Sequence, residues 1–428
     1  MLTHTEATPM RLLHVVGGSR FGGVASIILG LGKVARAEGW QVDVLTTDPV
    51  FQQAVRQHGL GLVNLDVIRR EIRPLWDLGG LLRLCKFLRR EPYHIVHTHT
   101  SKGGFVGRLA ARLAGVPIIV HTVHGFAFHE GSPVSIRLFY SALERIASRW
   151  CDRIVSVSEF HYEWAIQLGI CSPHKIVAIP NGIAEVGRNQ EVELAELRRQ
   201  LGARTGDLVI LSMARLAADK GVEYLIEAAA MLPRTGRLTR IVIAGDGPSR
   251  ERLERLANRL GVTDRVIFVG FRKDIGDLLA ACDLVIVPSL REGLSISLLE
   301  AMAAGKPIIA TSIGSQREVA SHGEMAWLVR PADPLSLSEG ILRVGGDQVL
   351  MARLGTNARV VYENYYTENR MLQAYMQLYL DLLGTNHPVE GTPAVERSNG
   401  LPATPPEELS QDYFEMAPSP HQQKGGGV

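Results

Sequence analysis

The sequence predicts an α/β protein built from two Rossmann-like, doubly wound halves that face each other across a cleft. The chain has 428 residues, which is enough for two or three domains. Short apolar runs alternate with segments of helical periodicity, a pattern typical of parallel sheets covered by helices. The alternation occurs twice, before and after the turn signal Pro180-Asn181-Gly182. Because ligands bind at the carboxyl ends of such sheets, we expect a ligand site between the halves.

The first half begins with an apolar strand that leads into a glycine-rich segment. The strand is expected at 11–16, and the segment GGSRFGG then runs into a helical pattern over 23–38. The glycine spacing is not G-x-G-x-x-G, which argues against a dinucleotide cofactor. Further strands of this half are expected at 41–46, 94–98, 117–122, 153–157 and 176–179.

The second half repeats this pattern and ends in a helix with a marked apolar stripe. Strands are expected at 208–213, 240–244, 265–269, 284–288 and 307–311, and helices at 221–232, 249–260 and 294–304. The last helix, 367–384, carries Met371, Tyr375, Leu378 and Leu382 at helical spacing. The stripe predicts that this helix crosses back and packs on the first half.

These patterns predict four parts of the chain. We expect domains at 1–182 and 183–366, the crossing helix at 367–384 and a tail at 385–428. The tail is rich in Pro, Gly, Ser and Thr and holds 2 Lys and Arg against 6 Asp and Glu. Because it lacks apolar periodicity, we expect it to be a disordered acidic segment.

Charge is distributed unevenly along a chain whose formal net charge is only +2. Residues 1–182 contain 20 Lys and Arg against 13 Asp and Glu, a net charge of +7. This asymmetry favours an anionic partner for the first half, either nucleic acid or a membrane surface, although basic side chains also simply solvate helix faces. Within 81–91, Arg83, Lys86 and Arg90 share one face, as in a basic amphipathic helix on a membrane. An ordinary solvated helix is the alternative.

Several classes of protein are disfavoured by composition. The four cysteines are far apart and form no C-x-x-C pair, which argues against a zinc site or a disulfide framework and for a reducing compartment. We expect neither a signal peptide nor a membrane span. No basic stripe rich in aromatic residues is present, which argues against a nucleic-acid partner.

The strongest motif is REGLSISLLEAMAAGKP at 291–307. Its helix is expected to begin near Ser295, so that free backbone N–H groups at Ser295 and Ile296 form an anion site. Glu292 precedes this helix, and Glu300 lies within it, where it can accept hydrogen bonds from sugar hydroxyls. An amphipathic helix with one exposed glutamate is the alternative reading of this segment alone.

The stretch from Glu292 to Pro307 resembles the E-x7-E signature of retaining glycosyltransferases with the GT-B fold, in particular family 4. Further similar segments follow the family order: FGG, HTVHG, MARLAADKG, GDGP and VGFRKDIGDLLAACD. The resemblance covers roughly 11–384. The segment 97–130 is similar to members that build bacterial surface polysaccharides.

The resemblance implies transfer of a sugar from a nucleotide-diphosphate sugar to a lipid-linked or saccharide acceptor, with retention of configuration. It implies UDP before GDP as the donor nucleotide, an acceptor site in the first half and a nucleotide site in the second. No Asp-x-Asp string is present, so we expect neither a metal nor another cofactor. We expect a cytoplasmic protein, peripheral on the inner face of the cell membrane. The alternatives are a sugar-nucleotide epimerase of the same fold and a non-enzymic protein that binds nucleotides or nucleic acid.

The resemblance and the chemistry of phosphate together nominate the site residues. His124 and Glu292 are the expected catalytic residues, with attack from the front face favoured over a carboxylate double displacement. The expected diphosphate ligands supply cations, helix N–H groups or close backbone approach, and are Gly22, Gly23, Arg215, Lys220, Ser295 and Ile296. The expected ribose and base contacts are Glu300, Gly245, Asp246, Val269, Phe271 and Arg272.

Overall fold

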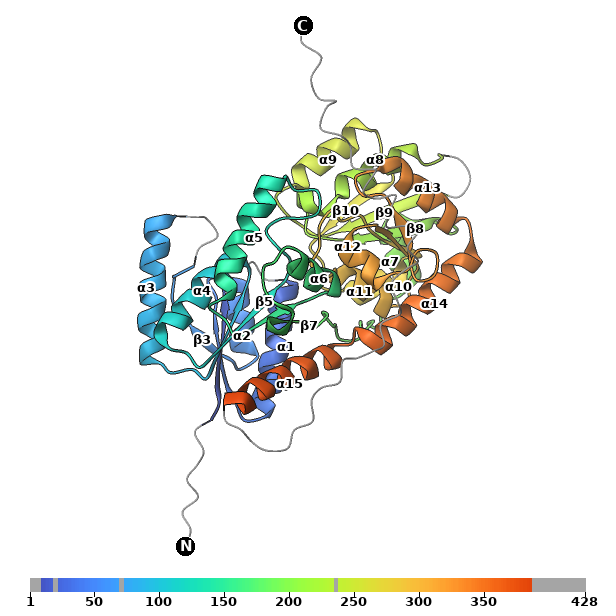
Figure 1. The fold of residues 1–428 in the computed structure, drawn as a ribbon. Helices are drawn as coiled ribbons and strands as arrows, with labels where there is room; N and C mark the ends of the chain where they lie inside the picture. Colours follow the sequence, from blue (N-terminus) through green and yellow to red (C-terminus); the bar gives the residue numbers. More distant parts are fainter. Residues whose placement is uncertain (1–8, 18–21, 69–72, 235–237, 387–428) are drawn as a thin grey trace. The chain divides into compact units, whose positions relative to one another are not determined.

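Two parallel β-sheets organise the protein in the computed structural model, which describes residues 9–17, 22–68, 73–234 and 238–386 (Figure 1). The first sheet has the order β3-β2-β1-β4-β5-β6-β7, and the second has the order β10-β9-β8-β11-β12-β13. Described residues of both sheets belong to one compact unit. The class and arrangement agree with the doubly wound halves predicted from the sequence.

The first sheet comprises β1 (Arg11–Val16), β2 (Gln41–Leu45), β3 (Gly61–Val63), β4 (Ile95–His99), β5 (Ile118–Val123), β6 (Arg153–Ser156) and β7 (Ile176–Ala178). Its helices are α1 (Gly23–Ala37), α2 (Pro49–Gln57), α3 (Pro74–Arg90), α4 (Ser101–Ala114), α5 (Val134–Ser148) and α6 (Glu159–Gln167), followed by the 3₁₀ turn η1 (Pro173–Lys175). In the centre of the sheet, Leu13 is paired with Asp43 of β2 and Val96 of β4.

The second sheet comprises β8 (Leu208–Met213), β9 (Thr239–Ala244), β10 (Val266–Gly270), β11 (Leu284–Val287), β12 (Ile308–Thr311) and β13 (Trp327–Val329). Its helices are α7 (Leu194–Gln200), α8 (Val222–Met231), α9 (Arg250–Arg259), α10 (Ile275–Ala281), α11 (Ile296–Ala303), α12 (Gly314–Val319), α13 (Pro334–Gly345) and α14 (Gln348–Tyr365), with the 3₁₀ turn η2 (Ala218–Lys220) before α8. The expected strands are present with ends shifted by one or two residues.

The sequence analysis missed the strands β3 and β13. Each has three residues and lies at an edge of its sheet. A strand of three residues is too short to show a recognisable pattern of apolar and polar residues. It is therefore recognised only by its pairing with the neighbouring strand. The expected tail falls almost entirely at 387–428, outside the described residues.

Each sheet is buried on both faces, which explains the continuous apolar runs in its strands. In β1, Leu12 and Val16 pack into one core cluster, and Leu13 and Val15 pack into the cluster on the opposite face. The strand order reverses at β1, whose neighbours are β2 and β4, and at β8, whose neighbours are β9 and β11. The crevices beyond these central strands are where such sheets bind ligands.

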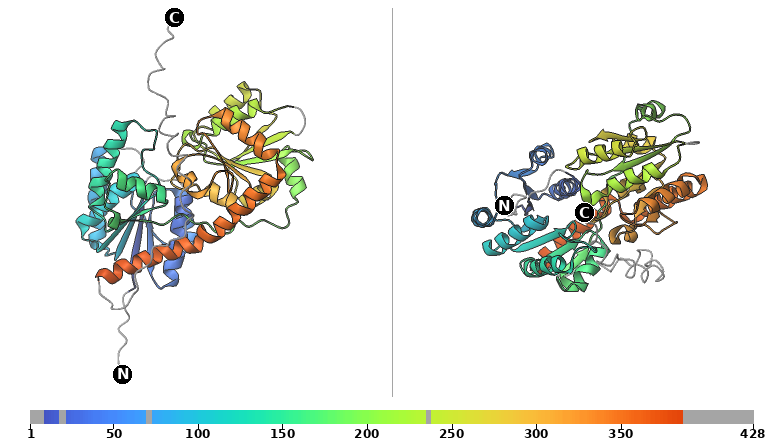
Figure 2. Two further views of the ribbon diagram at one scale, coloured as in Figure 1. Left: turned by 45° about the vertical axis from the view of Figure 1, so that its right-hand side comes forward. Right: turned by 90° about the horizontal axis from the view of Figure 1, so that it is seen from above.

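The last helix, α15 (Glu368–Asn386), packs on the first sheet although it follows the second sheet in sequence (Figure 2). Met371, Tyr375 and Leu382 lie in the core cluster that covers one face of the first sheet, as the apolar stripe predicts. Nearby, Ile183 N donates to Tyr366 O at 3.0 Å, and Glu368 N donates to Ile183 O at 2.8 Å. The chain passes from the first sheet to the second near Ile183 and returns near Tyr366. These two crossings therefore lie side by side.

Candidate active site

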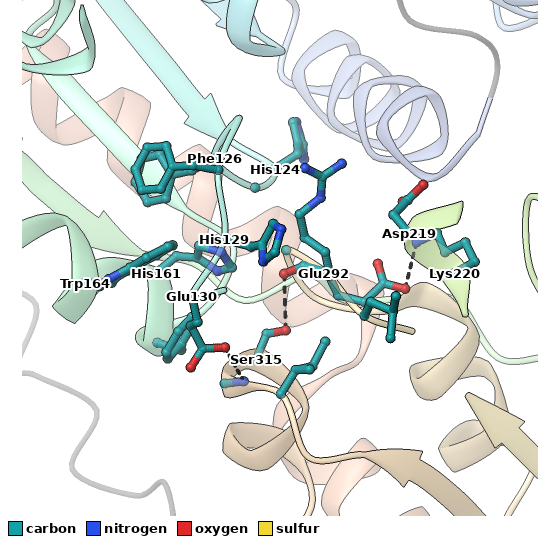
Figure 3. A pocket seen from close by; sticks show the side chains of 18 residues that line it. His124, Phe126, His129, Glu130, His161, Trp164, Asp219, Lys220, Glu292 and Ser315 are labelled. Atoms are coloured by element: carbon teal, nitrogen blue, oxygen red, sulfur yellow. Dashed lines mark hydrogen bonds and ion pairs between the residues drawn. The ribbon is translucent and has the colours of Figure 1, made fainter. Parts of the chain in front are cut away.

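A cavity of about 240 Å³ is lined by residues that follow strands of both sheets (Figure 3). From the first sheet, the lining comes from the segment after β5 and from α6. From the second sheet, it comes from the segments after β8, β11 and β12. The side chains around it are His124, Phe126, Phe128, His129, Glu130, Phe160, His161, Trp164, Asp219, Lys220, Leu290, Arg291, Glu292, Ile313 and Ser315.

His124 enters the cavity directly after β5. The next residue, Gly125, has a φ of +135°, and a side chain on Gly293 would lie 2.0 Å from His124 O. Both glycines are therefore required for the close approach of these two segments. The ring nitrogen His124 Nε2 lies 3.1 Å from His99 Nδ1, and burial lowers the pKa of His124 to about 4. The imidazole is therefore neutral at physiological pH.

Lys220 and Glu292 form an ion pair on the opposite side of the cavity. Lys220 Nζ donates to Glu292 Oε1 at 2.7 Å, and Ser289 Oγ donates to the same oxygen at 2.7 Å. Gly221, with a φ of +61°, lets the chain turn closely against the backbone of Pro288. The turn brings the segment after β8 against the segment after β11, and so pairs two residues that are far apart in sequence.

The expected diphosphate site lies around the start of α11. Ser295 is the N-cap, and its hydroxyl accepts a hydrogen bond from Leu298 N at 3.4 Å. A side chain on Gly23, the first residue of α1, would lie 2.9 Å from Ile296 Cγ1, so the beginnings of α1 and α11 approach each other. Ser297 Oγ donates to Met213 O at 2.6 Å, which ties α11 to the end of β8.

Arg215 and the glycine turn after β9 lie close to each other. Arg215 follows β8, and its side chain is 46% exposed. A terminal guanidinium nitrogen of Arg215 lies 3.5 Å from Asp219 Oδ1. A side chain on Gly245 would lie 1.8 Å from Ala214 O, so the turn rests on the backbone next to Arg215. Asp246 is exposed and accepts a hydrogen bond from Gly247 N at 2.7 Å.

Glu300 is a partly exposed carboxyl in the second turn of α11. Burial raises its pKa to about 7, and its side chain has no hydrogen-bond partner among the described residues. Such a group can accept hydrogen bonds from a ligand. At the end of β10, Val269 is partly buried and Phe271 is 68% exposed. Arg272 Nε donates to Asp274 at 2.7 Å and is therefore held by a carboxylate.

Three of the predicted site residues line the cavity: His124, Lys220 and Glu292. The remaining predicted residues lie outside it, at the start of α1 or beyond the carboxyl ends of strands of the second sheet. Asp246, which was expected to line the cleft, is exposed, and its carboxylate accepts a hydrogen bond from the backbone of Gly247. Lys220, which was expected to bind the diphosphate, forms an ion pair with Glu292.

The sequence analysis missed an aromatic wall on the first-sheet side of the cavity. Phe126 and Phe128 stack with ring centroids 5.2 Å apart, and Phe160 stacks on Trp164 at 5.7 Å. A signal was present, since Phe126 and Phe128 alternate after His124, and Phe160 and Trp164 are spaced by one helical turn. These residues could not be joined from sequence, because 31 positions separate Phe128 from Phe160 and only the fold brings them together.

Comparison with known proteins identifies the class. A model described as a glycosyl transferase 4-like domain matches residues 22–182, and the model of glycosyl transferases group 1 matches residues 194–361. The chain is 32% identical to the Escherichia coli UDP-Gal:alpha-D-GlcNAc-diphosphoundecaprenol alpha-1,3-galactosyltransferase, over 73% of this chain and 82% of that protein. It is 31% identical to the putative glycosyltransferase EpsD of Bacillus subtilis (strain 168), over 80% and 89% of the two chains.

Solved structures agree with this result. Anabaena Alr3699/HepE in complex with UDP and glucose has a TM-score of 0.75 and 24% identity, over 87% of this chain and all of that chain. A sucrose-phosphate synthase from Thermosynechococcus elongatus has a TM-score of 0.73 and 22% identity, over 88% of this chain and 100% of that chain. The fold and the cavity between two sheets define a GT-B glycosyltransferase. Within this class, the chain belongs to glycosyltransferase family 4.

Proposed function

We propose that this glycosyltransferase transfers a sugar from a UDP-sugar to a lipid-linked or saccharide acceptor, with retention of configuration and without a metal, in the synthesis of a surface polysaccharide. The observation that carries the proposal is the cavity, which sets His124 of the first half opposite the Lys220–Glu292 pair of the second. A donor sugar bound there meets groups from both halves.

Two lines of support favour a UDP-sugar as donor. The Escherichia coli relative is named for UDP-Gal, and solved structures of Anabaena Alr3699/HepE contain UDP or UDP-glucose. In this chain, Arg215 contacts Asp219, which lines the cavity, and α11 begins shortly after Gly293, which also lines it. They offer a cation and backbone N–H groups to a diphosphate. Glu300 offers an acceptor for ribose hydroxyls. A GDP-sugar remains the alternative donor.

The surroundings of Glu292 support retention by front-face attack. Its Oε1 already accepts hydrogen bonds from Lys220 and Ser289, which lowers its nucleophilicity. In a front-face reaction the acceptor attacks from the side of the leaving diphosphate, and the diphosphate takes the acceptor proton. Lys220, Arg215 and the helix N–H groups stabilise the negative charge that develops on that leaving group.

The proposal assigns the stabilisation of the leaving group to residues of the protein and not to a metal. Among the described residues, three metal-ligating groups converge at His14, His97 and His99, and none of these lines the cavity. The charge on the leaving diphosphate is then stabilised by Lys220, Arg215 and the start of α11.

The acceptor side of the proposal rests on α3, α4 and α5, which pack in sequence along the first sheet (Figure 1). On α3, Arg83, Lys86 and Arg90 are exposed, as the basic amphipathic pattern predicts. Exposed large apolar side chains accompany them on all three helices: Leu75, Leu78, Leu82, Leu113, Val134, Ile136, Leu138, Phe139 and Ile146. Apolar and basic groups together suit the surface of an anionic membrane, where lipid-linked acceptors reside. No described helix is both long and apolar enough to cross a bilayer.

A donor panel tests the central claim. We expect UDP, and one UDP-sugar among UDP-glucose, UDP-galactose and UDP-N-acetylglucosamine, to raise the melting temperature by mass action. The shift should be lost in Lys220→Ala and kept in Lys33→Ala, which removes an exposed lysine of α1. If only GDP raises the melting temperature, the donor is a GDP-sugar and not a UDP-sugar. A new sugar nucleotide formed without any acceptor would indicate an epimerase instead.

A vesicle assay tests the membrane surface. Replacing Arg83, Lys86 and Arg90 by Glu, or Leu138 and Phe139 by Ser, should reduce binding to vesicles containing phosphatidylglycerol. Activity toward a soluble acceptor should change little. The matched control replaces Leu342 and Val349 by Ser, since these exposed apolar residues lie on α13 and α14. If both sets of variants bind vesicles like the wild type, these helices are ordinary solvated surfaces.

A further inference from the structure

Three histidine rings form a hydrogen-bonded line from the core of the first sheet to the cavity. His14 Nδ1 on β1 lies 3.0 Å from His99 Nε2 on β4, and His99 Nδ1 lies 3.1 Å from His124 Nε2. His14 and His99 are fully buried. His124 Nδ1 has no hydrogen-bond partner among the described residues, and His124 lines the cavity (Figure 3).

The N–H protons of the three rings must all point the same way along the line, either toward the core or toward the cavity. Burial lowers the pKa of His14 to about 3, that of His124 to about 4 and that of His99 well below its usual value, so all three rings are neutral. A neutral imidazole has one N–H donor and one bare nitrogen acceptor. His99, which is bonded on both sides, therefore donates toward one neighbour and accepts from the other.

His14 Nε2, at the buried end of the line, decides in which direction the N–H protons point. His14 Nε2 is buried and has no partner. If the protons point into the core, His14 Nε2 is an unpaired buried N–H group. If they point to the cavity, it is an unpaired acceptor. Orphaned N–H groups are the rarer of these two defects in proteins, so the second arrangement is favoured.

The neighbouring His97 stands apart from this line and cannot reverse it. His97 Nδ1 lies 2.5 Å from Tyr379 Oη of α15, and His97 Nε2 lies 2.7 Å from Thr122 Oγ1. His97 therefore touches the line only by ring contact, with its centroid 4.3 Å from that of His99. A cation held by His14, His97 and His99 would have to break hydrogen bonds of both His97 and His99.

We propose that His99, which lies in line with His14, is a positioning residue that fixes His124 as the Nδ1–H tautomer, so that His124 presents a hydrogen-bond donor to the cavity. This tautomer is the less common one in a free histidine side chain. The inference deepens the proposed function, on which it rests for the role of His124. It assigns His124 to donate to an oxygen of the donor sugar or its leaving phosphate, and not to remove the proton of the acceptor.

The tautomer can be measured directly on the full-length protein without any substrate. Protein labelled with ¹⁵N in its histidine rings is observed by two-bond ¹H–¹⁵N correlation, and the His124 signals are identified from their loss in His124→Gln. We expect a neutral Nδ1–H ring from pH 6 to 9. An Nε2–H ring in the wild type would overturn the proposal, whatever the result of the donor panel.

Variants test whether the hydrogen bonds of this line determine the tautomer of His124. In His99→Leu, which removes the hydrogen bond to His124 Nε2, His124 should become a mixture of tautomers, while His121→Leu should leave it unchanged. His121 is a suitable control because it is buried on β5 but bonds Thr98 instead of the line. With the UDP-sugar identified by the panel, His99→Leu should lower kcat roughly fivefold with little change in KM, about the value of one neutral hydrogen bond. An unchanged tautomer in His99→Leu would refute the mechanism, and a melting-temperature control shows whether this variant folds.

Discussion

Replacement of the cations Arg215 and Lys220 in the second half should weaken donor binding most directly. Arg215→Ala or Lys220→Ala should abolish turnover and weaken UDP binding by about 1.5–3 kcal/mol for each charged hydrogen bond lost. Titration calorimetry with UDP measures this effect. Lys220→Ala should have a second consequence, because the Glu292 carboxylate then keeps Ser289 as its only side-chain hydrogen-bond donor among the described residues.

Arg259→Ala is the matched control for these variants, since Arg259 is exposed at the end of α9. It should bind UDP like the wild type. Unchanged UDP affinity in both Arg215→Ala and Lys220→Ala would show that neither cation meets the diphosphate.

Glu300 predicts a pH dependence of stability. Its pKa is raised from 4.5 to about 7 by burial, so the folded state holds this proton more tightly than the unfolded state. Its contribution to stability is therefore complete below about pH 4.5 and is lost as the pH rises through 7, a loss of roughly 1–3 kcal/mol. Glu300→Gln removes the titration, so its melting temperature should fall less than that of the wild type between pH 5 and pH 8. The exposed Glu251→Gln should behave like the wild type, and a Glu300→Gln curve parallel to the wild type would contradict the assignment.

At the scale of elements, α15 should be required for folding because it completes the core of the first sheet. Tyr375 and Tyr379 are fully buried there, and Met371 and Leu382 pack beside them. Fully burying one large apolar side chain contributes about 1.5–3 kcal/mol. Truncation at 366 should therefore lower the melting temperature sharply and abolish activity. Removing 386–428 should preserve both, and equal behaviour of the two truncations would refute this division.

The motif helix α11 shows how far one element can be predicted. Its start at Ser295 follows from a local rule, since a serine side chain caps the free N–H groups of the first turn. The approach of Gly23 to Ile296 follows from no local rule, because α1 belongs to the other half. The helix start was therefore predicted from the sequence, and the approach of α1 to it was found only in the fold.

At the scale of the whole molecule, the two halves are joined by a carboxylate clamp as well as by the chain crossings. Glu318 of α12 accepts hydrogen bonds from the backbone N–H groups of Glu159 and Phe160 at the start of α6, both at 2.9 Å. Glu130 adds a contact to Gly314 N at 3.4 Å. Glu130, Phe160 and Gly314 also line the cavity, so these contacts lie at its edge.

A chelator tests how the assembled molecule stabilises its leaving group. If Lys220, Arg215 and the start of α11 supply the positive charge, EDTA should leave most transferase activity intact. The measurement is UDP release with acceptor present, before and after dialysis against EDTA. Loss of activity that Mn²⁺ or Mg²⁺ restores would show that a metal shares this role.

The sequence by itself determined the two doubly wound halves, the helix start at Ser295 and the family resemblance, because periodicity, capping and contiguous motifs are local properties of the chain. Only the tertiary structure decided which residues meet. The Lys220–Glu292 pair, the aromatic wall and the line from His14 to His124 join segments that are distant in sequence. The paired ions and neutral rings depend on burial and on neighbours from other strands, and these arise only when the sheets assemble.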